Sequence, residues 1–301
     1  MSLRSVLVTG GTGFIGRHFC RSALARGMRV TVLTRDVKAA KENLPPETRL
    51  CGSLDELRSH DTFQIVVNLA GEPLAARRWN TARKQSFYTS RVGFTDRLVT
   101  FFKNHNQVPD HVISGSAVGF YGPSQAPLDE TSSPIDGFSH RLCRDWESSA
   151  RAFEALGSRV CCLRTGIVLG EQGALSRMLP AFKVGLGGPL GSGEQWMSWI
   201  HRDDMVASIH HCIDHVELRG PVNATALNPV TNRQFTRALG VALQRPTILP
   251  MSAFMARLLF GEMADELLLQ GQNVRPAALS ASGFKFLYPQ LEVALSSLLV
   301  E

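Results

Sequence analysis

The feature that most constrains this chain is a short apolar run near the N-terminus that ends in regularly spaced glycines. Residues 6–9 read Val-Leu-Val-Thr, as in a buried strand, and Gly10, Gly13 and Gly16 follow. Gly10 allows a tight turn, Gly13 lets the backbone approach a diphosphate, and Gly16 lets a helix pack closely on the strand. The spacing predicts a dinucleotide site in which the phosphates meet free amides at a helix N-terminus.

The next segments complete a strand–helix–strand unit. Residues 17–26 carry apolar side chains near helical spacing, Gly27 ends that segment, and residues 28–33 read as a second buried strand. Glycines also occur in turns for purely structural reasons, but this context favours the nucleotide site. The predicted contacts from the first turn and helix start are Gly10, Thr12, Gly13, Phe14, Ile15 and Gly16.

The end of the second strand distinguishes between the two nicotinamide cofactors, because it faces the adenosine ribose. A carboxylate there accepts from the 2′-hydroxyl, whereas a cation accommodates a 2′-phosphate. Here the strand runs into Thr34, Arg35 and Asp36. Arg35 offers a planar fork suited to phosphate and Thr34 a hydroxyl, whereas Asp36 comes late for the carboxylate of an NAD site. We predict NADP, with NAD less favoured; the alternative for Arg35 is a solvated surface side chain.

Later strands continue the same pattern. Residues 64–71 form an apolar run closed by a small-residue turn, which predicts a strand ending beside the glycine loop. Residues 111–114 and 160–165 read as further buried strands with helical stretches before them. Strands that alternate with helices predict an α/β protein with a doubly wound parallel sheet. The predicted cofactor contacts from these strand ends are Leu69, Ala70, Gly71 and Ser114.

The composition changes after residue 166. The glycine-rich segment 185–193 cannot be one regular element, and residues 221–225 look like a strand that returns to the main sheet. We therefore predict a nucleotide-binding domain of residues 1–165 with returning segments at about 198–226. The predicted smaller substrate lobe comprises residues 166–197 and 227–301.

The amino-acid composition narrows the classes of function that the chain can have. With 44% hydrophobic and 19% charged residues among 301, the chain has an ordinary globular composition. The net charge of +6 comes from scattered basic residues, which suits an anionic cofactor better than nucleic acid. Six cysteines without zinc-type spacing indicate core thiols in a reducing compartment and no metal site. With no signal peptide and no long apolar run, we predict a cytoplasmic protein without a membrane partner.

Several motifs together resemble the extended short-chain dehydrogenases/reductases and, within them, the YfcH-type epimerase family. They read GGTGFIG at 10–16, NLAG at 68–71, SGS at 114–116, RTGIVLG at 164–170 and WIHRDD at 199–204. The resemblance implies a Rossmann-type domain, a bound NAD(P) and a smaller C-terminal substrate lobe.

The superfamily's chemistry uses a tyrosine to move a proton and a lysine four residues later to lower its pKa and hold the ribose. The chain has three tyrosines, and none is followed by lysine at that spacing. Matching the superfamily's pattern places Ser139 where the tyrosine would stand and Cys143 where the lysine would stand. Serine is too weak an acid to act alone, and Cys143 has no fixed positive charge.

Three other side chains are the candidates for catalysis. Ser116 occupies the place of the family's polarising hydroxyl, although a serine can also cap a strand end. Tyr121 could be a displaced acid or a buried tyrosine with a satisfied hydroxyl. His140 could move a proton near neutral pH or lie on a helix surface.

The segment around His201, Asp203 and Asp204 could suggest a metal or acid–base cluster. We interpret it instead as a strand-to-helix junction in which a carboxylate caps the helix.

Two functions remain at this stage. The first is an NADP-dependent oxidoreductase or epimerase-like enzyme acting on an unknown small polar or sugar-like substrate, with a homodimer as a candidate assembly. The alternative is a catalytically silent NADP(H)-binding sensor or protein-interaction module, which the missing tyrosine–lysine pair motivates.

Overall fold

The computed structural model describes residues 4–57 and 61–299, and it is built around a parallel sheet of seven strands. The strand order is β11-β7-β5-β4-β1-β2-β3, and every neighbouring pair is parallel. The strands are β1 (Ser5–Thr9), β2 (Arg29–Leu33), β3 (Arg49–Cys51), β4 (Ile65–Asn68), β5 (His111–Ala117), β7 (Arg159–Thr165) and β11 (Gly220–Ala224). The order reverses beside β1, which places a crevice at the carboxyl ends of β1 and β4. The predicted doubly wound sheet and its returning strand are confirmed.

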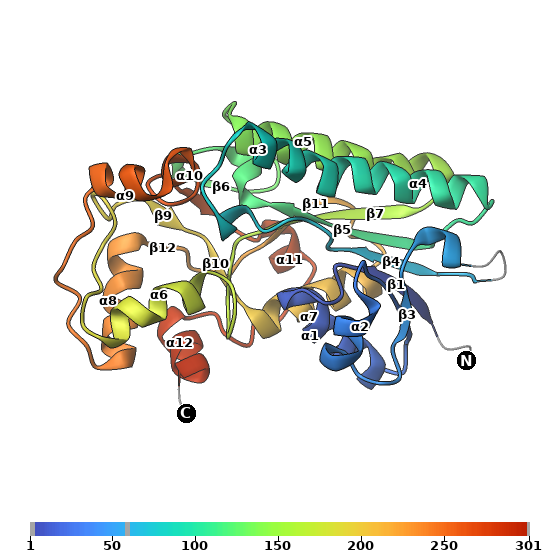
Figure 1. Cartoon of the computed structure of the whole chain (residues 1–301), viewed down its shortest axis with the longest axis horizontal. Helices are drawn as coiled ribbons and strands as arrows, with labels where there is room; N and C mark the ends of the chain where they lie inside the picture. Colours follow the sequence, from blue (N-terminus) through green and yellow to red (C-terminus); the bar gives the residue numbers. More distant parts are fainter. Residues whose placement is uncertain (1–3, 58–60, 300–301) are drawn as a thin grey trace.

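Helices cover both faces of this sheet (Figure 1). On one face lie α1 (Phe14–Ala25) and α7 (Arg202–Asp214), with α2 (Val37–Asn43) near the β3 edge. On the other lie α3 (Thr81–Tyr88), the π-helical turn η3 (Thr89–Gly93), α4 (Phe94–Asn104), α5 (Phe138–Arg151) and the 3-10 turn η5 (Ala152–Leu156). The π-turn thus joins α3 to α4 and ends at Gly93.

Strand β1 shows how the two faces share the core. Val6 and Val8 pack in one cluster with residues of α1 and α7, whereas Leu7 packs in a second cluster with residues of α4 and α5. All three side chains are fully buried. A strand buried on both faces needs an unbroken apolar run, which is why residues 6–8 could be recognised as a strand.

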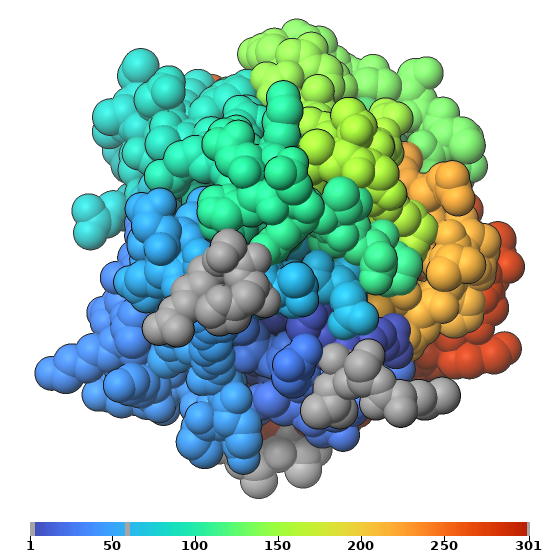
Figure 2. All heavy atoms as spheres, turned by 90° about the vertical axis from the view of Figure 1, so that its right-hand side faces the viewer, coloured from blue at the N-terminus to red at the C-terminus, as the bar shows by residue number. Residues whose placement is uncertain are grey.

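A second group of elements lies at the end of the molecule opposite β3 (Figure 1). Three small sheets pair β8 (Ile167–Leu169) with β10 (Trp199–His201), β9 (Trp196–Met197) with β12 (Val230–Thr231), and β6 (Ser124–Leu128) with β13 (Gln272–Val274). The helices of this group are α6 (Ala174–Lys183), α8 (Asn232–Leu243), α9 (Ala253–Phe260), α10 (Glu262–Leu267) and α12 (Leu291–Leu299), whereas α11 (Ala277–Ala281) lies near the middle of the molecule. Outside this group, short 3-10 turns follow β3, β4 and β5: they are η1 (Leu54–Glu56), η2 (Leu74–Ala76) and η4 (Val118–Tyr121). In the view onto the β3 end, most of the face comes from the N-terminal half of the chain, and C-terminal residues appear only at its margin (Figure 2).

The smaller group has a core of its own, in which Trp199, Phe235 and Leu295 are fully buried. Two residues from the segment assigned to the smaller lobe, Leu279 and Phe284, pack instead in the core beside α7 and β11. The division after residue 165 coincides with the end of β7, and the lobe boundaries stay a prediction.

No helix in the described ranges is both long and apolar enough to cross a bilayer.

Candidate functional site

The glycine turn after β1 is closed by contacts that leave no room for side chains. Gly10 has a φ of +67°, and a Cβ on it would lie 2.5 Å from the carbonyl oxygen of Leu69. A Cβ on Gly16 would approach the Gly10 carbonyl oxygen more closely than the 3.0 Å that real Cβ atoms keep. The Gly13 amide donates to that same carbonyl at 3.0 Å. The predicted roles of Gly10 in the turn and of Gly16 in close helix packing are confirmed.

The helix that follows has an open N-terminus. Gly13 is the N-cap residue of α1, so no side chain accepts from the first amides, and the first turn holds no acidic residue. Those amides and the positive end of the helix dipole are left for an outside acceptor. This arrangement fits a diphosphate group without further side chains.

A cleft of about 980 Å³ opens over this turn. Its walls come from the ends of β1, β2, β3 and β4 and from the helices at residues 81–104. The predicted cofactor residues that line it are Gly10, Thr12, Gly13, Thr34, Arg35, Leu69, Ala70 and Gly71. Residues of one sheet edge that are far apart in sequence therefore meet in one elongated site.

Four predicted contacts do not line the cleft with their side chains. Phe14 packs against Gly170, Ile15 packs partly buried against the core, and Gly16 lies beneath the turn. Ser114 is fully buried, with its hydroxyl 3.5 Å from the Asn68 amide nitrogen. Phe14 and Ile15 could therefore contact a ligand only through their backbone groups at the start of α1.

Asn68 ties the strand ends together beneath the cleft. It accepts from the Thr9 hydroxyl at 2.6 Å and donates to the Thr95 hydroxyl at 2.9 Å. Both bonds are buried, so they hold β1, β4 and α4 in fixed relation.

Sequence reasoning missed two groups that line the cleft. One is the turn after β3, residues 52–55, which includes Asp55; the other is on the helices, with Ser86, Ser90 and Arg97 among its members. The first could have been found from the parallel pairing of β2 with β3, because neighbouring parallel strands end at the same sheet edge. The second had no signal, since helix periodicity does not show which side chains face a ligand.

The end of β2 fits the predicted nucleotide preference. Arg35 is exposed at the cleft, and within the described ranges its guanidinium makes no hydrogen bond or ion pair. Asp36 instead caps α2, accepting from the Ala39 amide at 2.9 Å. Its carboxylate is thus occupied by its own helix, and Arg35 is the side chain left to meet a phosphate.

The predicted catalytic residues Ser116 and Tyr121 join one buried polar network. Ser116 donates to Glu147 Oε1 at 2.6 Å, and Arg164 donates to both carboxylate oxygens at 2.9 Å. Arg164 Nη1 also donates to the Tyr121 hydroxyl at 3.0 Å, and that hydroxyl donates to Asn223 at 2.7 Å. The network links β5, α5, β7 and β11 below the crevice.

This network directs the protons of both hydroxyls. A carboxylate only accepts, so the Ser116 proton points toward Glu147 rather than toward a substrate oxygen. Burial raises the pKa of Tyr121, which keeps its phenol protonated near neutral pH. The catalytic roles of Ser116 and Tyr121 stay predictions, and each would need its present partner to be exchanged for a substrate.

Residues 139–143, which match the superfamily's tyrosine–lysine segment, are also bonded or buried within the protein. His140 is 8% exposed and its Nδ1 lies 2.7 Å from the Phe120 carbonyl, so its interpretation as a surface helix residue is wrong. Ser139 donates to Glu266 of α10 at 2.6 Å. Cys143 is buried, and burial followed by the Glu147 charge raises its pKa to about 11. The Cys143 thiol is therefore neutral and cannot stand in for a lysine.

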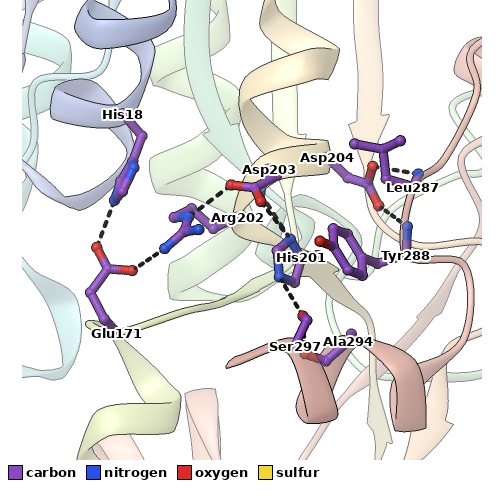
Figure 3. Close-up of polar contacts among 10 residues, drawn as sticks. All are labelled: His18, Glu171, His201, Arg202, Asp203, Asp204, Leu287, Tyr288, Ala294 and Ser297. Atoms are coloured by element: carbon purple, nitrogen blue, oxygen red, sulfur yellow. Dashed lines mark hydrogen bonds and ion pairs between the residues drawn. The ribbon is translucent and has the colours of Figure 1, made fainter. Parts of the chain in front are cut away.

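The junction at His201 is a strand-to-helix junction, but the predicted capping group is wrong. Nδ1 of His201 accepts from the Asp203 amide at 3.0 Å, so the histidine caps α7. Asp204 accepts from the amides of Leu287 and Tyr288 at 2.8 and 2.9 Å. It thereby anchors the C-terminal segment to α7 (Figure 3). Within residues 4–57 and 61–299, no cluster of three or more His, Cys, Asp or Glu side chains is arranged to hold a metal.

Glu171 joins the same junction to α1. It lies between His18 Nε2 at 2.6 Å and Arg202 Nη1 at 2.6 Å (Figure 3). Burial alone would raise the pKa of Glu171, but the bonds from His18 and Arg202 lower it to about 2. None of these three residues lines the cleft over the glycine turn.

The buried histidines predict acid sensitivity. Burial lowers the pKa of His201 and of His210 from 6.5 to about 4. Between about pH 6.5 and pH 4 these two histidines bind protons in the unfolded chain but not in the folded chain. The free energy of unfolding therefore falls as the pH drops through that window. Urea denaturation at pH 7.5 and pH 5 measures this loss. His210→Leu should reduce the difference between the two pH values; an unchanged difference would count against the assignment.

Comparisons with known proteins agree with this geometry. The model of the NAD dependent epimerase/dehydratase family matches residues 6–224, and a domain of unknown function, DUF1731, matches residues 251–298. The chain is 40% identical to epimerase family protein Mb2239 of Mycobacterium bovis, over 96% of each chain. A crystal structure of human epimerase family protein SDR39U1 with NADPH matches with a TM-score of 0.87 and 33% identity, covering 98% of both chains.

A more distant structure shows the fold alone. MoeE5 in complex with UDP-glucuronic acid and NAD matches at 22% identity, with a TM-score of 0.78, over 98% of this chain and 97% of that one. Of these two structures, that of SDR39U1 holds NADPH and that of MoeE5 holds NAD.

Proposed function

Because the chain belongs to the NAD dependent epimerase/dehydratase family, we propose that its cleft binds NADP(H) and that the protein is an oxidoreductase or epimerase-like enzyme. The proposed substrate is a small polar or sugar-like molecule that carries a carbonyl or an oxidisable hydroxyl. The bound nucleotide would supply hydride chemistry at its nicotinamide. The observation that carries this proposal is the cleft over the glycine turn, with the uncapped α1 N-terminus at its floor.

The residues along the cleft fit an extended dinucleotide. The diphosphate would lie on the amides at the start of α1, with Gly13 leaving the approach open. The adenosine would lie toward the ends of β2 and β3, where Thr34, Arg35 and Asp55 line the cleft. The nicotinamide would then lie toward the ends of β4 and β5, since the ligand must cross β1 between its two halves.

NADP is the proposed nucleotide because Arg35 is free at the adenosine end and the nearby carboxylate of Asp36 is not. Arg35→Ala should weaken NADPH binding by about 1.5 to 3 kcal/mol, the value of a charge-assisted hydrogen bond, and leave NADH binding nearly unchanged. Titration calorimetry with both nucleotides measures the two effects. Lys41→Ala, an exposed change on α2, is the control, and equal losses for NADPH and NADH would contradict the assignment.

One observation favours a second function, nucleotide binding without turnover. The hydroxyls of Ser116 and Tyr121 already donate within the buried network, so neither of these two predicted groups has a free proton to offer a substrate. Oxidation of NADPH by purified protein with a panel of carbonyl compounds would support the enzyme. Tight binding with a silent panel would support the sensor.

A further inference from the structure

Arg91 is a partly buried cation that the proposed mechanism has not used. It lies in the π-turn between α3 and α4, and its Nη2 donates to the Glu72 carbonyl oxygen at 3.0 Å. Its Nη1 is buried and has no hydrogen-bond partner in the part of the chain that the structure describes. The guanidinium carbon lies 5.3 Å from the Trp146 ring and 5.9 Å from the Phe87 ring. Aromatic rings therefore hold the cation. The Glu72 charge opposes the fall in the pKa of Arg91, but none of the described carboxylates forms an ion pair with it.

A second donor without a partner lies beside it. The indole Nε1 of Trp146 is also buried and unbonded among the described residues. The Trp146 ring packs against β5, where a Cβ on Gly115 would lie 2.7 Å from it. A buried donor without an acceptor costs about 1 to 3 kcal/mol. Two such donors on neighbouring side chains indicate a place for acceptor oxygens that a ligand brings.

The π-turn and Gly71 place Arg91 at the edge of the cleft. π-turns are rare in helices and are frequent at functional sites. Gly71 lines the cleft, and a Cβ on it would lie 3.0 Å from Cζ of Arg91. Gly71 lies in the turn after β4, and β4 is on the side of β1 away from β2, so this is the part of the cleft beyond the diphosphate, toward the proposed nicotinamide position.

Arg91 also brings a positive charge close to Cys143, which stands where the superfamily has its lysine. The Cys143 thiol lies close enough to the guanidinium for Arg91 to oppose the rise in its pKa. Burial lowers the pKa of Arg91 to about 10, which leaves it protonated at neutral pH. A fixed positive charge is therefore present beside Cys143, delivered from α3–α4 rather than from α5.

We propose that Arg91 holds the ribose next to the nicotinamide, by a hydrogen bond from Nη1 to a ribose hydroxyl, and so replaces the cation that Cys143 does not provide. The Trp146 indole N–H is the second donor to the same group. This inference rests on the proposed binding of NADP(H), and it adds a residue that positions the reactive end of the nucleotide. No proton or electron moves at Arg91.

Three ligands test this assignment on the intact chain. NADPH and 2′-phospho-ADP-ribose both carry the second ribose, whereas adenosine 2′,5′-bisphosphate lacks it. Arg91→Met should weaken the first two about tenfold or more, as loss of a charge-assisted hydrogen bond does, and change the third less than about twofold. Calorimetry gives the three affinities, and thermal denaturation checks that the variant is folded.

Two further variants separate the possible failures. Arg91→Lys keeps the charge and should recover part of the lost NADPH affinity, whereas Arg141→Met, an exposed change on α5, should alter none of the three. Equal affinities in wild type and Arg91→Met, or equal losses for all three ligands, would overturn the role of Arg91. Wild-type protein that binds none of the ligands would overturn the proposed function itself. If Arg91→Met does not fold, the same ligand comparison with Arg91→Lys decides the question.

Discussion

Replacing Glu147 by alanine should lower the free energy of unfolding by about 3 to 5 kcal/mol, the usual cost of removing one partner of a buried ion pair. The side chains of Glu147 and Arg164 are 10% and 5% exposed, and two hydrogen bonds of 2.9 Å join them. Without the carboxylate, the Arg164 guanidinium stays buried against the Phe120 ring with its charge uncompensated. Ser116 also loses its acceptor. Urea denaturation at neutral pH measures the effect.

An exposed pair provides the matched control. Glu154 lies 3.3 Å from Arg151 on the same helical segment, and these side chains are 41% and 59% exposed. Solvent screens such pairs, so Glu154→Ala should change stability by less than about 1 kcal/mol. A Glu147→Ala variant as stable as Glu154→Ala would mean that the Ser116 hydroxyl is not held by a buried carboxylate.

The second large effect is expected at Gly16. Gly16→Ala would drive a methyl group into the Gly10 carbonyl, and because that atom belongs to the backbone of the turn, relief requires the turn and α1 to separate. Overpacking of this kind costs about 1 to 3 kcal/mol. The same shift moves the amides that we propose to hold the diphosphate. We therefore expect Gly16→Ala to lose stability and NADPH affinity together, as measured by thermal denaturation and calorimetry.

Gly93 is the matched control for this change. It has helical backbone angles, with φ −61° and ψ −30°, and a Cβ on it would meet nothing within 4 Å. Gly93→Ala should therefore raise stability by about 0.5 to 1 kcal/mol, because alanine restricts the unfolded chain. If both alanine variants were equally stable, the close packing of α1 on the glycine turn would be refuted.

Most of the sheet could be predicted because its strands are buried on both faces. Such strands appear as unbroken apolar runs, as at residues 6–8 and 64–69, and the glycines after β1 fix the direction of the chain at the crevice. The residues at the strand ends could be predicted for the same reason. Parallel strands bring their carboxyl ends to one edge, so Thr34 and Leu69 were expected at a common site and do line one cleft.

The polar interior could not be predicted, because it depends on contacts between distant segments. The pairing of Glu147 with Arg164 needs the register of α5 against β7, which periodicity does not fix. The π-turn that turns Arg91 inward has the same apolar pattern as a continuous helix. The cap at His201 reverses the expected roles, since a neutral imidazole accepts from the helix and frees Asp204 to bind the C-terminal segment.

Titration of the wild-type protein with NADPH tests the central claim most directly, because that claim is that the cleft over Gly10 and Gly13 holds a pyridine dinucleotide. We expect saturable binding with one nucleotide per chain, tighter for NADPH than for NADH. Absence of measurable heat with either nucleotide, from protein shown to be folded, would contradict the account.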